Sequence, residues 1–511
     1  MAVPEIAVRQ RTKLIDENPD LEENAWGYQI EPGMKTYAWT KLLLDDRALA
    51  TEYDDPDLNK ATGNGLMKLP EGRTAKDVVT EYLRGMHAMY KRAVIDRIGE
   101  DKLQNLPVDY WLTVPATWSE RAKLLTKAAA LDAGFGSKPN DRLLLIPEPE
   151  AAAHLALKSS MHHIEDLIDE KSGVMVCDMG GGTVDITTYE VKRKTPTLKL
   201  REITIGKGGK CGGTFVDRNL YKLLAARFGT AFTSLGPQHI GPGSQFMDDF
   251  ELAKQDFTIS NPSRRPRRIT LAMRSLVVTP DLEKYYDEGM GQIKLYNEDM
   301  HTVFDPVVDV ILKLVADQVD QVKRLNEPRI QTIVLVGGFG SSLYIKDRLG
   351  PWCAERDIRL TTPWHGAWSA VVCGAVLRGV EGSISDEKKC RRHYGHGAIL
   401  NADTETNTAF GMHVPEGGDL IDTHELYSCS LDDAPESIEN DRIEHVGTIK
   451  YSLEGIDLTK VKSTVDANGK KWYKLELVLN IRMGDEAGVL VYRIFYRGRE
   501  VGKAELSFSY T

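Results

Sequence analysis

The sequence lacks any long uninterrupted apolar run. Its best stretch, residues 332–345, is broken by three glycines and two serines. It therefore falls short of the roughly 18 apolar residues that a membrane helix requires. The first 20 residues carry charges throughout and hold no apolar core of the kind a secretory signal needs. We therefore expect neither a membrane span nor a secretory signal.

Cysteine is scarce as well, with 6 among 511 residues and no Cys-x-x-Cys pair. This usage excludes a disulfide scaffold and favours reduced thiols, so we expect a cytoplasmic chain, with the nucleus as the alternative compartment. The tightest grouping of metal-ligand types is Cys390, His393 and His396. It lacks a clear fourth ligand, so the sequence disfavours a zinc site there.

Charge of one sign is not in large excess. The chain has 65 Lys and Arg against 75 Asp and Glu, a net charge of -10, and its 41% hydrophobic and 27% charged residues are typical of globular proteins. The basic stretch at residues 264–268 has no interleaved aromatic residues, so a solvated loop or an acidic partner is a better interpretation than nucleic acid.

At about 100 to 200 residues per domain, the length predicts three or four domains or lobes.

Up to residue 380 the sequence predicts alternating helices and strands, because apolar residues recur at helical spacing in some segments and form short runs in others. Ser119 is a suitable N-cap, and Pro149 suits a first helical turn. Helices are expected at residues 74–98, from 119 to 131, from 148 onward, and at 215–228, 245–257, 306–323 and 371–380. Strands are expected at residues 110–114 and 143–146, as a hairpin within 174–191, and at 332–336.

Beyond residue 380 the pattern changes. Apolar and polar residues nearly alternate over residues 474–483, after a turn-like sequence at 466–469, and residues 448–453 and 489–496 suit partner strands. Residues 381–440 are interpreted mainly as loop and short strands. The chain is therefore expected to end in a small β-rich domain that packs on the preceding body, with capture of an extended peptide by a strand edge as the less favoured alternative.

Residues 178–185 carry the strongest chemical signal. They read Asp-Met-Gly-Gly-Gly-Thr-Val-Asp and follow a buried apolar strand. Gly180, Gly181 and Gly182 allow a polyphosphate to approach bare backbone N–H groups. The carboxylates of Asp178 and Asp185 can hold water on a divalent cation. A phosphate-binding hairpin is therefore favoured over a plain glycine-rich turn.

A second glycine cluster lies at residues 206–213 and precedes an expected helix. Its two Gly-Lys pairs are not followed by Ser or Thr, which excludes a P-loop.

These motifs, in this order, resemble the ATPase domain of the 70-kilodalton heat shock chaperones, within the superfamily of actin and sugar kinases. The resemblance covers residues 26 to 380 and is greatest to the atypical, lidless branch of heat shock 70 kDa protein 12-like proteins. Residues 178–185 resemble the family's second phosphate motif, residues 146–153 its interlobe connecting segment and residues 333–339 its adenosine motif. Lys41, within residues 39–44, matches the catalytic lysine.

The resemblance implies a two-lobed, actin-like (ribonuclease H-like) α/β ATPase followed by a β-rich C-terminal domain. Residues 1–172 would form the first lobe, 173–380 the second lobe and 381–511 the β-rich domain. The family's first phosphate hairpin, of the form Asp-x-Gly-Thr-Thr, has no counterpart in the 40 residues before Lys41. We therefore expect an incomplete first lobe, which reflects either a mis-assigned start of the reading frame or a protein that no longer turns over ATP.

The same resemblance implies roles for the residues nearest the phosphates. Asp178 would hold the hydration shell of magnesium, and Thr183 with Gly180, Gly181 and Gly182 would contact the phosphates. Glu148 and Lys41 would orient the attacking water and stabilise charge on the γ-phosphoryl group. A plain surface lysine is the alternative interpretation of Lys41.

Further residues would surround the nucleoside. Gly212 and Gly213 would face the phosphates or ribose, and Gly337 and Gly338 would let the nucleoside ring approach the backbone. Glu251 and Lys254 would reach the nucleoside, although their spacing suits a solvated ion pair equally well. Gln255 replaces an arginine that usually stacks on adenine, and Phe339 replaces a small polar residue, which puts the identity of the base in question.

The resulting hypothesis is a chaperone-related protein that binds ATP with magnesium, with weak hydrolysis to ADP and phosphate if its first lobe is complete. A pseudo-ATPase scaffold and a small-molecule (sugar) kinase of the same superfamily are the alternatives. The expected partners are ATP or ADP and, through the β-rich domain, an unfolded or extended polypeptide or another protein. The typical acidic linker and helical lid are not evident, so coupling of hydrolysis to peptide clamping is not expected.

Overall fold

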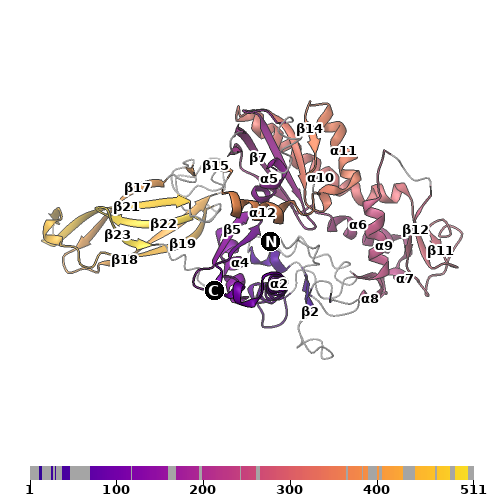
Figure 1. Ribbon diagram of the computed structural model, residues 1–511, viewed down its shortest axis with the longest axis horizontal. Coiled ribbons are helices and arrows are strands. Elements are labelled where there is room, and N and C mark those ends of the chain that lie inside the picture. Colours follow the sequence, from indigo (N-terminus) through magenta and orange to yellow (C-terminus); the bar gives the residue numbers. More distant parts are fainter. Residues whose placement is uncertain are drawn as a thin grey trace. The chain divides into compact units, whose positions relative to one another are not determined.

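The computed structural model describes most of the chain from residue 69 onward. The described residues are 11–13, 25–26, 29, 37–38, 40–45, 69–116, 118–158, 168–194, 198–241, 243–260, 265–363, 366–382, 384–388, 400–401, 405–429, 443–466, 469–483 and 490–503. The chain divides into two compact units (Figure 1). The first unit comprises Met1–Lys194 and Gly206–Gly382, and the second comprises Thr195–Ile205 and Ser383–Thr511. The division at residues 172 and 380 that the sequence suggested stays a prediction.

A mixed sheet forms the centre of the first unit. Strand β6 (Gly173–Met179) pairs in parallel with β13 (Ile330–Val336) and antiparallel with β7 (Val184–Arg193). Strand β14 (Arg359–Thr361) extends the sheet beyond β13, and β9 (Lys207–Gly209) pairs with β7. Every residue of β6 is buried, as its nearly continuous apolar sequence predicts. The predicted hairpin within residues 174–191 is thus confirmed.

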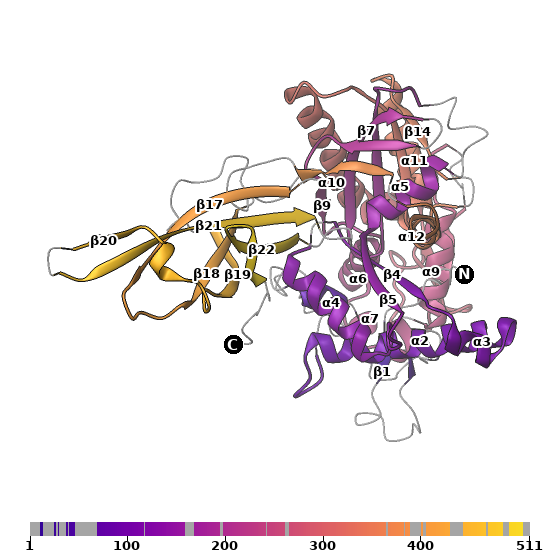
Figure 2. The same ribbon diagram turned by 60° about the vertical axis from the view of Figure 1, so that its left-hand side comes forward.

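The first unit also contains a separate two-stranded parallel sheet, made of β4 (Asp109–Val114) and β5 (Arg142–Pro147). Helices α2 (Ala75–Ile98) and α4 (Glu120–Asp132) lie beside them (Figure 2). Ser119 caps α4 as predicted, because its side chain accepts a hydrogen bond from the backbone N–H of Ala122 at 3.2 Å.

Helices α5 (Glu148–Lys158) and α12 (Ala370–Glu381) cross at a glycine. A Cβ atom at Gly374 would lie 1.6 Å from the carbonyl oxygen of Ala151, so only glycine allows the two backbones to approach this closely. The predicted helices at these positions are confirmed, and α5 begins at Glu148 with Pro149 in its first turn.

Four further helices and a small sheet complete the core of the first unit. They are α6 (Thr214–Phe228), α9 (Gln245–Gln255), α10 (Asn297–Arg324), α11 (Leu343–Ala354) and the antiparallel strands β10 (Arg267–Thr270), β12 (Gln292–Leu295) and β11 (Tyr286–Asp287). The expected start of α10 at Pro306 is wrong. The helix begins at Asn297, where the Asp299 carboxylate accepts a hydrogen bond from Tyr296 N at 2.8 Å, and Pro306 lies inside it.

The remaining elements of the first unit are short. They are β1 (Arg11–Lys13), β2 (Ala25–Trp26), β3 (Tyr37–Ala38), η3 (Thr40–Leu44), α3 (Glu100–Asn105), α7 (Thr230–Thr233), α8 (Pro237–Ile240) and η6 (Phe339–Ser341).

The second unit is built on a curved antiparallel sheet with the strand order β17-β21-β22-β23-β19-β18. The predicted strands appear as β21 (Lys471–Met483), β22 (Leu490–Tyr496) and β19 (Ile443–Ser452). The expectation of loop and short strands at residues 381–440 is wrong in part, because β17 (Glu405–Pro415) and β18 (Ile421–Cys429) are long strands. The other elements are β8 (Lys199–Glu202), β15 (Ser385–Lys388), β16 (Leu400–Asn401), η7 (Leu458–Lys460), β20 (Ser463–Val465) and β23 (Arg499–Lys503).

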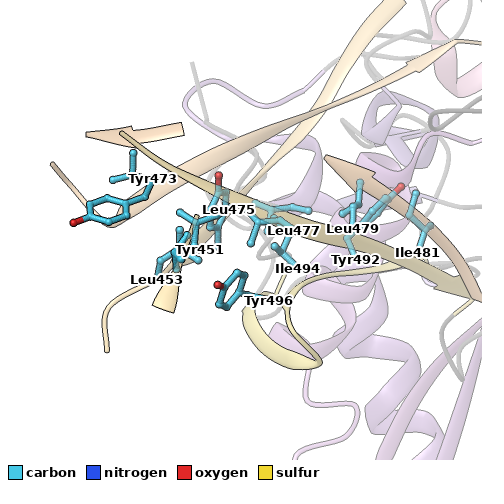
Figure 3. Packing of buried hydrophobic residues seen from close by; sticks show 13 residues of the cluster. Tyr451, Leu453, Tyr473, Leu475, Leu477, Leu479, Ile481, Tyr492, Ile494 and Tyr496 are labelled. Atoms are coloured by element: carbon cyan, nitrogen blue, oxygen red, sulfur yellow. The ribbon is translucent and has the colours of Figure 1, made fainter. Parts of the chain in front are cut away.

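An apolar cluster supports one face of this sheet (Figure 3). Leu475, Leu477 and Ile494 are fully buried at its centre, and tyrosines such as Tyr451 and Tyr492 surround them. The alternating pattern of β21 therefore places its leucines in a hydrophobic core of the second unit's own. Among the helices that the structure describes in either unit, none is long and apolar enough to cross a membrane.

Candidate functional site

The glycine hairpin between β6 and β7 is the centre of the candidate site. Gly180, Gly181 and Gly182 lie in the bend, which Gly180 N closes by donating to Thr183 O at 2.9 Å. Gly181 is exposed, and the nearest atom to a Cβ built on it lies 3.9 Å away. At Gly181 the bend thus presents exposed backbone, as contact with a phosphate requires.

Two carboxylates lie at the base of this hairpin. Asp178 and Asp185 are direct cross-strand partners in the β6–β7 ladder, and their exposed fractions are only 8% and 3%. Like charges placed opposite one another in a sheet repel, and a hydrated divalent cation would offset that repulsion. The pair therefore fits the magnesium that the family resemblance implies.

The second glycine cluster packs directly on the hairpin. A Cβ atom at Gly212 would lie 2.4 Å from the carbonyl oxygen of Gly181, so the loop can approach only because this residue is glycine. Gly213 N donates to Gly180 O at 3.1 Å, and Thr214 donates to Gly181 O through its N–H at 2.9 Å and its hydroxyl at 2.6 Å. The first turn of α6 is thus fastened to the hairpin.

The third glycine segment lies at the end of β13, against the same hairpin. Gly337 has a φ of +80°, and a Cβ atom there would lie 2.5 Å from both Asp178 Oδ1 and Met179 O. Gly338 is exposed. The ring of Phe339 lies 3.3 Å from the position that a Cβ atom of Gly213 would take. All three glycine segments therefore meet at one place.

Lys41 and Glu148 form an ion pair. The Lys41 Nζ lies 2.6 Å from Glu148 Oε1 and 5.3 Å from the ring centre of Trp118. The next residue, Leu42, approaches the hairpin, with its Cδ1 atom 3.8 Å from a Cβ atom built on Gly182. The structure thus brings together Lys41 and Glu148, two of the residues with predicted catalytic roles, and places the lysine segment beside the bend.

Glu251 and Lys254 lie on α9, and the lysine side chain, which is only 11% exposed, lies between two carboxylates. Its Nζ atom lies 2.5 Å from Glu251 and 2.8 Å from Asp217 on α6. Burial opposes the charge on Lys254, but the two carboxylates outweigh this effect and raise its pKa. Asp217 was not among the predicted site residues. The signal that could have identified it is its position at the start of α6, four residues after Gly213.

Among the residues that the structure describes, no cluster of three or more His, Cys, Asp and Glu side chains could hold a metal ion directly. The weak zinc candidate Cys390, His393 and His396 lies outside the described residues. The expected role of Asp178, through water to magnesium, needs no such cluster.

Comparisons with known proteins agree with the motifs. No protein-family model matches the chain. The chain is 24% identical over 473 residues to Heat shock 70 kDa protein 12A of Mus musculus, a match that covers 77% of this chain and 63% of that protein. It is 27% identical over 378 residues to Heat shock 70 kDa protein 12B of Homo sapiens, covering 60% of this chain and 52% of the relative. Chaperone protein DnaK of Thermoplasma volcanium is 23% identical over 269 residues, covering 52% of this chain and 40% of its own length.

The chain is a homologue of the heat shock 70 kDa proteins. This relationship confirms the family resemblance inferred from the motifs. Together with the mixed α/β fold and its several sheets, it implies an actin-like ATPase fold for this heat shock 70 kDa homologue. The matched region spans 63% of the length of the 12A proteins.

Proposed function

We propose that the first unit binds ATP with magnesium, as part of a chaperone-related protein with a two-lobed ATPase body. The observation that carries the proposal is the meeting of three glycine segments at one hairpin. Gly212 and Gly337 each lie so close to that hairpin that no Cβ atom fits. Glycine-rich turns that expose backbone N–H groups are a general means of holding phosphate oxygens.

In this proposal the phosphates lie along the bend formed by Gly180, Gly181, Gly182 and Thr183. Asp178 and Asp185 hold magnesium through its water shell, and the cation supplies positive charge near the phosphate oxygens. Gly212 and Gly213 approach the phosphates or ribose, and Gly337 and Gly338 adjoin the nucleoside. Glu251 and Lys254, both on α9, reach the nucleoside.

For hydrolysis, Glu148 orients the attacking water and Lys41 stabilises negative charge that develops on the transferred phosphoryl group. The ion pair between the two side chains supports this assignment, because each fixes the position of the other. The products would be ADP and phosphate. The second unit is proposed to bind an extended polypeptide or another protein.

Phosphate release by the purified chain tests the proposal and separates it from its rivals. We expect slow release of phosphate from ATP with magnesium and without any acceptor, and a loss of that release in Glu148→Gln. Release that requires an added sugar would instead indicate a small-molecule kinase. Nucleotide binding without release above the level of Glu148→Gln would indicate a pseudo-ATPase scaffold.

A further inference from the structure

An exposed tryptophan lies beside the third glycine segment. Trp368 lies two residues before the start of α12, and 37% of its surface is exposed. Its Cδ1 atom lies 3.7 Å from the position that a Cβ atom of Gly338 would take. A backbone hydrogen bond holds the two segments together, because Gly337 N, next to Gly338, donates to the carbonyl oxygen of Ala367, next to Trp368, at 2.9 Å. The indole ring of Trp368 is thus held next to the exposed Gly338.

Phe339, the other aromatic residue at this segment, is already engaged. Its ring packs against Gly213 and faces Phe304, with the two ring centres 6.4 Å apart. These contacts cover part of the Phe339 ring, which leaves less of it for a bound base. Trp368 has the larger ring and, beside the exposed Gly338, the more accessible one.

We propose that Trp368 is the stacking platform for the base of the bound nucleotide and determines base preference. The inference rests on the proposed function, because the glycine segments that bind the phosphates and sugar place the base near Gly338. Base stacking on an aromatic ring is favourable for every base and strengthens with the size of the π-system, so purines bind more tightly than pyrimidines. Stacking also requires no hydrogen bond to the base edge, which makes the site tolerant of both adenine and guanine.

Two ligands distinguish the contribution of the base to binding from that of the phosphates. Binding of ATP and of inorganic tripolyphosphate, each with magnesium, is measured by calorimetry on the full chain. Trp368→Ala is expected to weaken ATP binding by roughly 5- to 150-fold, the loss of one stacked base, and to leave tripolyphosphate binding unchanged. Trp368→Phe, which retains a ring, should restore most of the ATP affinity, and Trp472→Ala in the second unit is the matched control.

Base preference gives a second measurement that a merely structural role would not change. The ratio of ATP to CTP affinity should exceed one in the unaltered chain, stay above one in Trp368→Phe and approach one in Trp368→Ala. If Trp368→Ala binds ATP and CTP as the unaltered chain does, while Asp178→Ala abolishes both, the inference is wrong and the proposed function stands. If the unaltered chain binds neither ATP nor tripolyphosphate, the proposed function fails and this inference fails with it.

Discussion

The Nζ atom of Lys41 lies 2.6 Å from Oε1 of Glu148, a residue 107 positions further along the chain. Both side chains are partly shielded from solvent, with exposed fractions of 26% and 14%. Such a contact between distant segments fixes the η3 turn relative to the start of α5. In the proposed reaction, this pair sets the position of the attacking water.

Removal of either partner should therefore reduce ATP turnover. Lys41→Met and Glu148→Gln are each expected to lower the turnover rate about 100- to 1000-fold, since each removes a group that acts in the transition state. Because the two residues act as a unit, the double variant should lose little more than either single one. Single-turnover phosphate release measures all three rates.

The ion pair between Lys76 and Asp132, also 2.6 Å long and also in the first unit, offers a matched control. Lys76→Met should leave turnover unchanged. Strictly additive losses in the Lys41 and Glu148 double variant would contradict the view that these residues work together.

Gly212 tests how closely the second glycine cluster must approach the hairpin. Gly212→Ala places a methyl group 2.4 Å from Gly181 O, so the loop and the hairpin must separate. Overpacking of this kind typically costs about 1 to 3 kcal/mol of stability. We expect a lower midpoint in urea unfolding and the loss of measurable ATP binding.

Gly350, inside α11, is the matched control, because no atom lies within 4 Å of a Cβ atom built there. Gly350→Ala should leave ATP binding intact and raise the free energy of unfolding by about 0.5 to 1 kcal/mol. Equal ATP affinity in Gly212→Ala and Gly350→Ala would show that the contact with the hairpin is not needed for binding.

His424 makes the second unit sensitive to acid. Its ring stacks on Phe410 with the ring centres 4.5 Å apart. Burial lowers the His424 pKa, and the nearby Asp422 and Glu425 offset this only in part. Because the folded-state pKa lies below the unfolded value of about 6.5, this residue contributes full stability above pH 6.5 and loses it as the pH falls.

Thermal melting of the full chain at pH 7.5 and pH 5.5 checks this sign. His424→Phe should reduce the difference between the two melting temperatures, and His413→Phe, exposed on β17, should leave the difference unchanged. A larger difference in His424→Phe than in the unaltered chain would contradict the predicted direction.

Local sequence signals predicted much of this structure. The β6–β7 hairpin follows from a buried apolar run that ends in three glycines, and β21 follows from its alternating leucines. Strand β17 was missed, although Phe410, Met412 and Val414 alternate in the same way, because interleaved glycine and histidine weaken the pattern. The start of α10 was missed because the helix already begins at Asn297, and Pro306, where it was expected to start, lies inside it.

The candidate site was predictable residue by residue only where a motif carried it. Contacts such as that of Asp217 with Lys254, or of Trp368 with Gly338, join segments that no local pattern relates. Burial and pairing of this kind arise when the chain folds, since the partners come from different helices and loops. The sequence therefore identified the glycine segments and the side chains that match a family motif, such as Lys41 and Glu148, but not Asp217 and Trp368.

The most direct test of the account is the melting temperature of the full chain with and without millimolar ATP and magnesium. A ligand present at 100 times its Kd stabilises the folded state by about 2.7 kcal/mol, which gives a measurable upward shift. We predict such a shift in the unaltered chain and its loss in Asp178→Ala and in Asp178→Asn. A cooperatively melting chain that shows no shift, or variants that shift as much as the unaltered chain, would contradict nucleotide binding at the glycine hairpin.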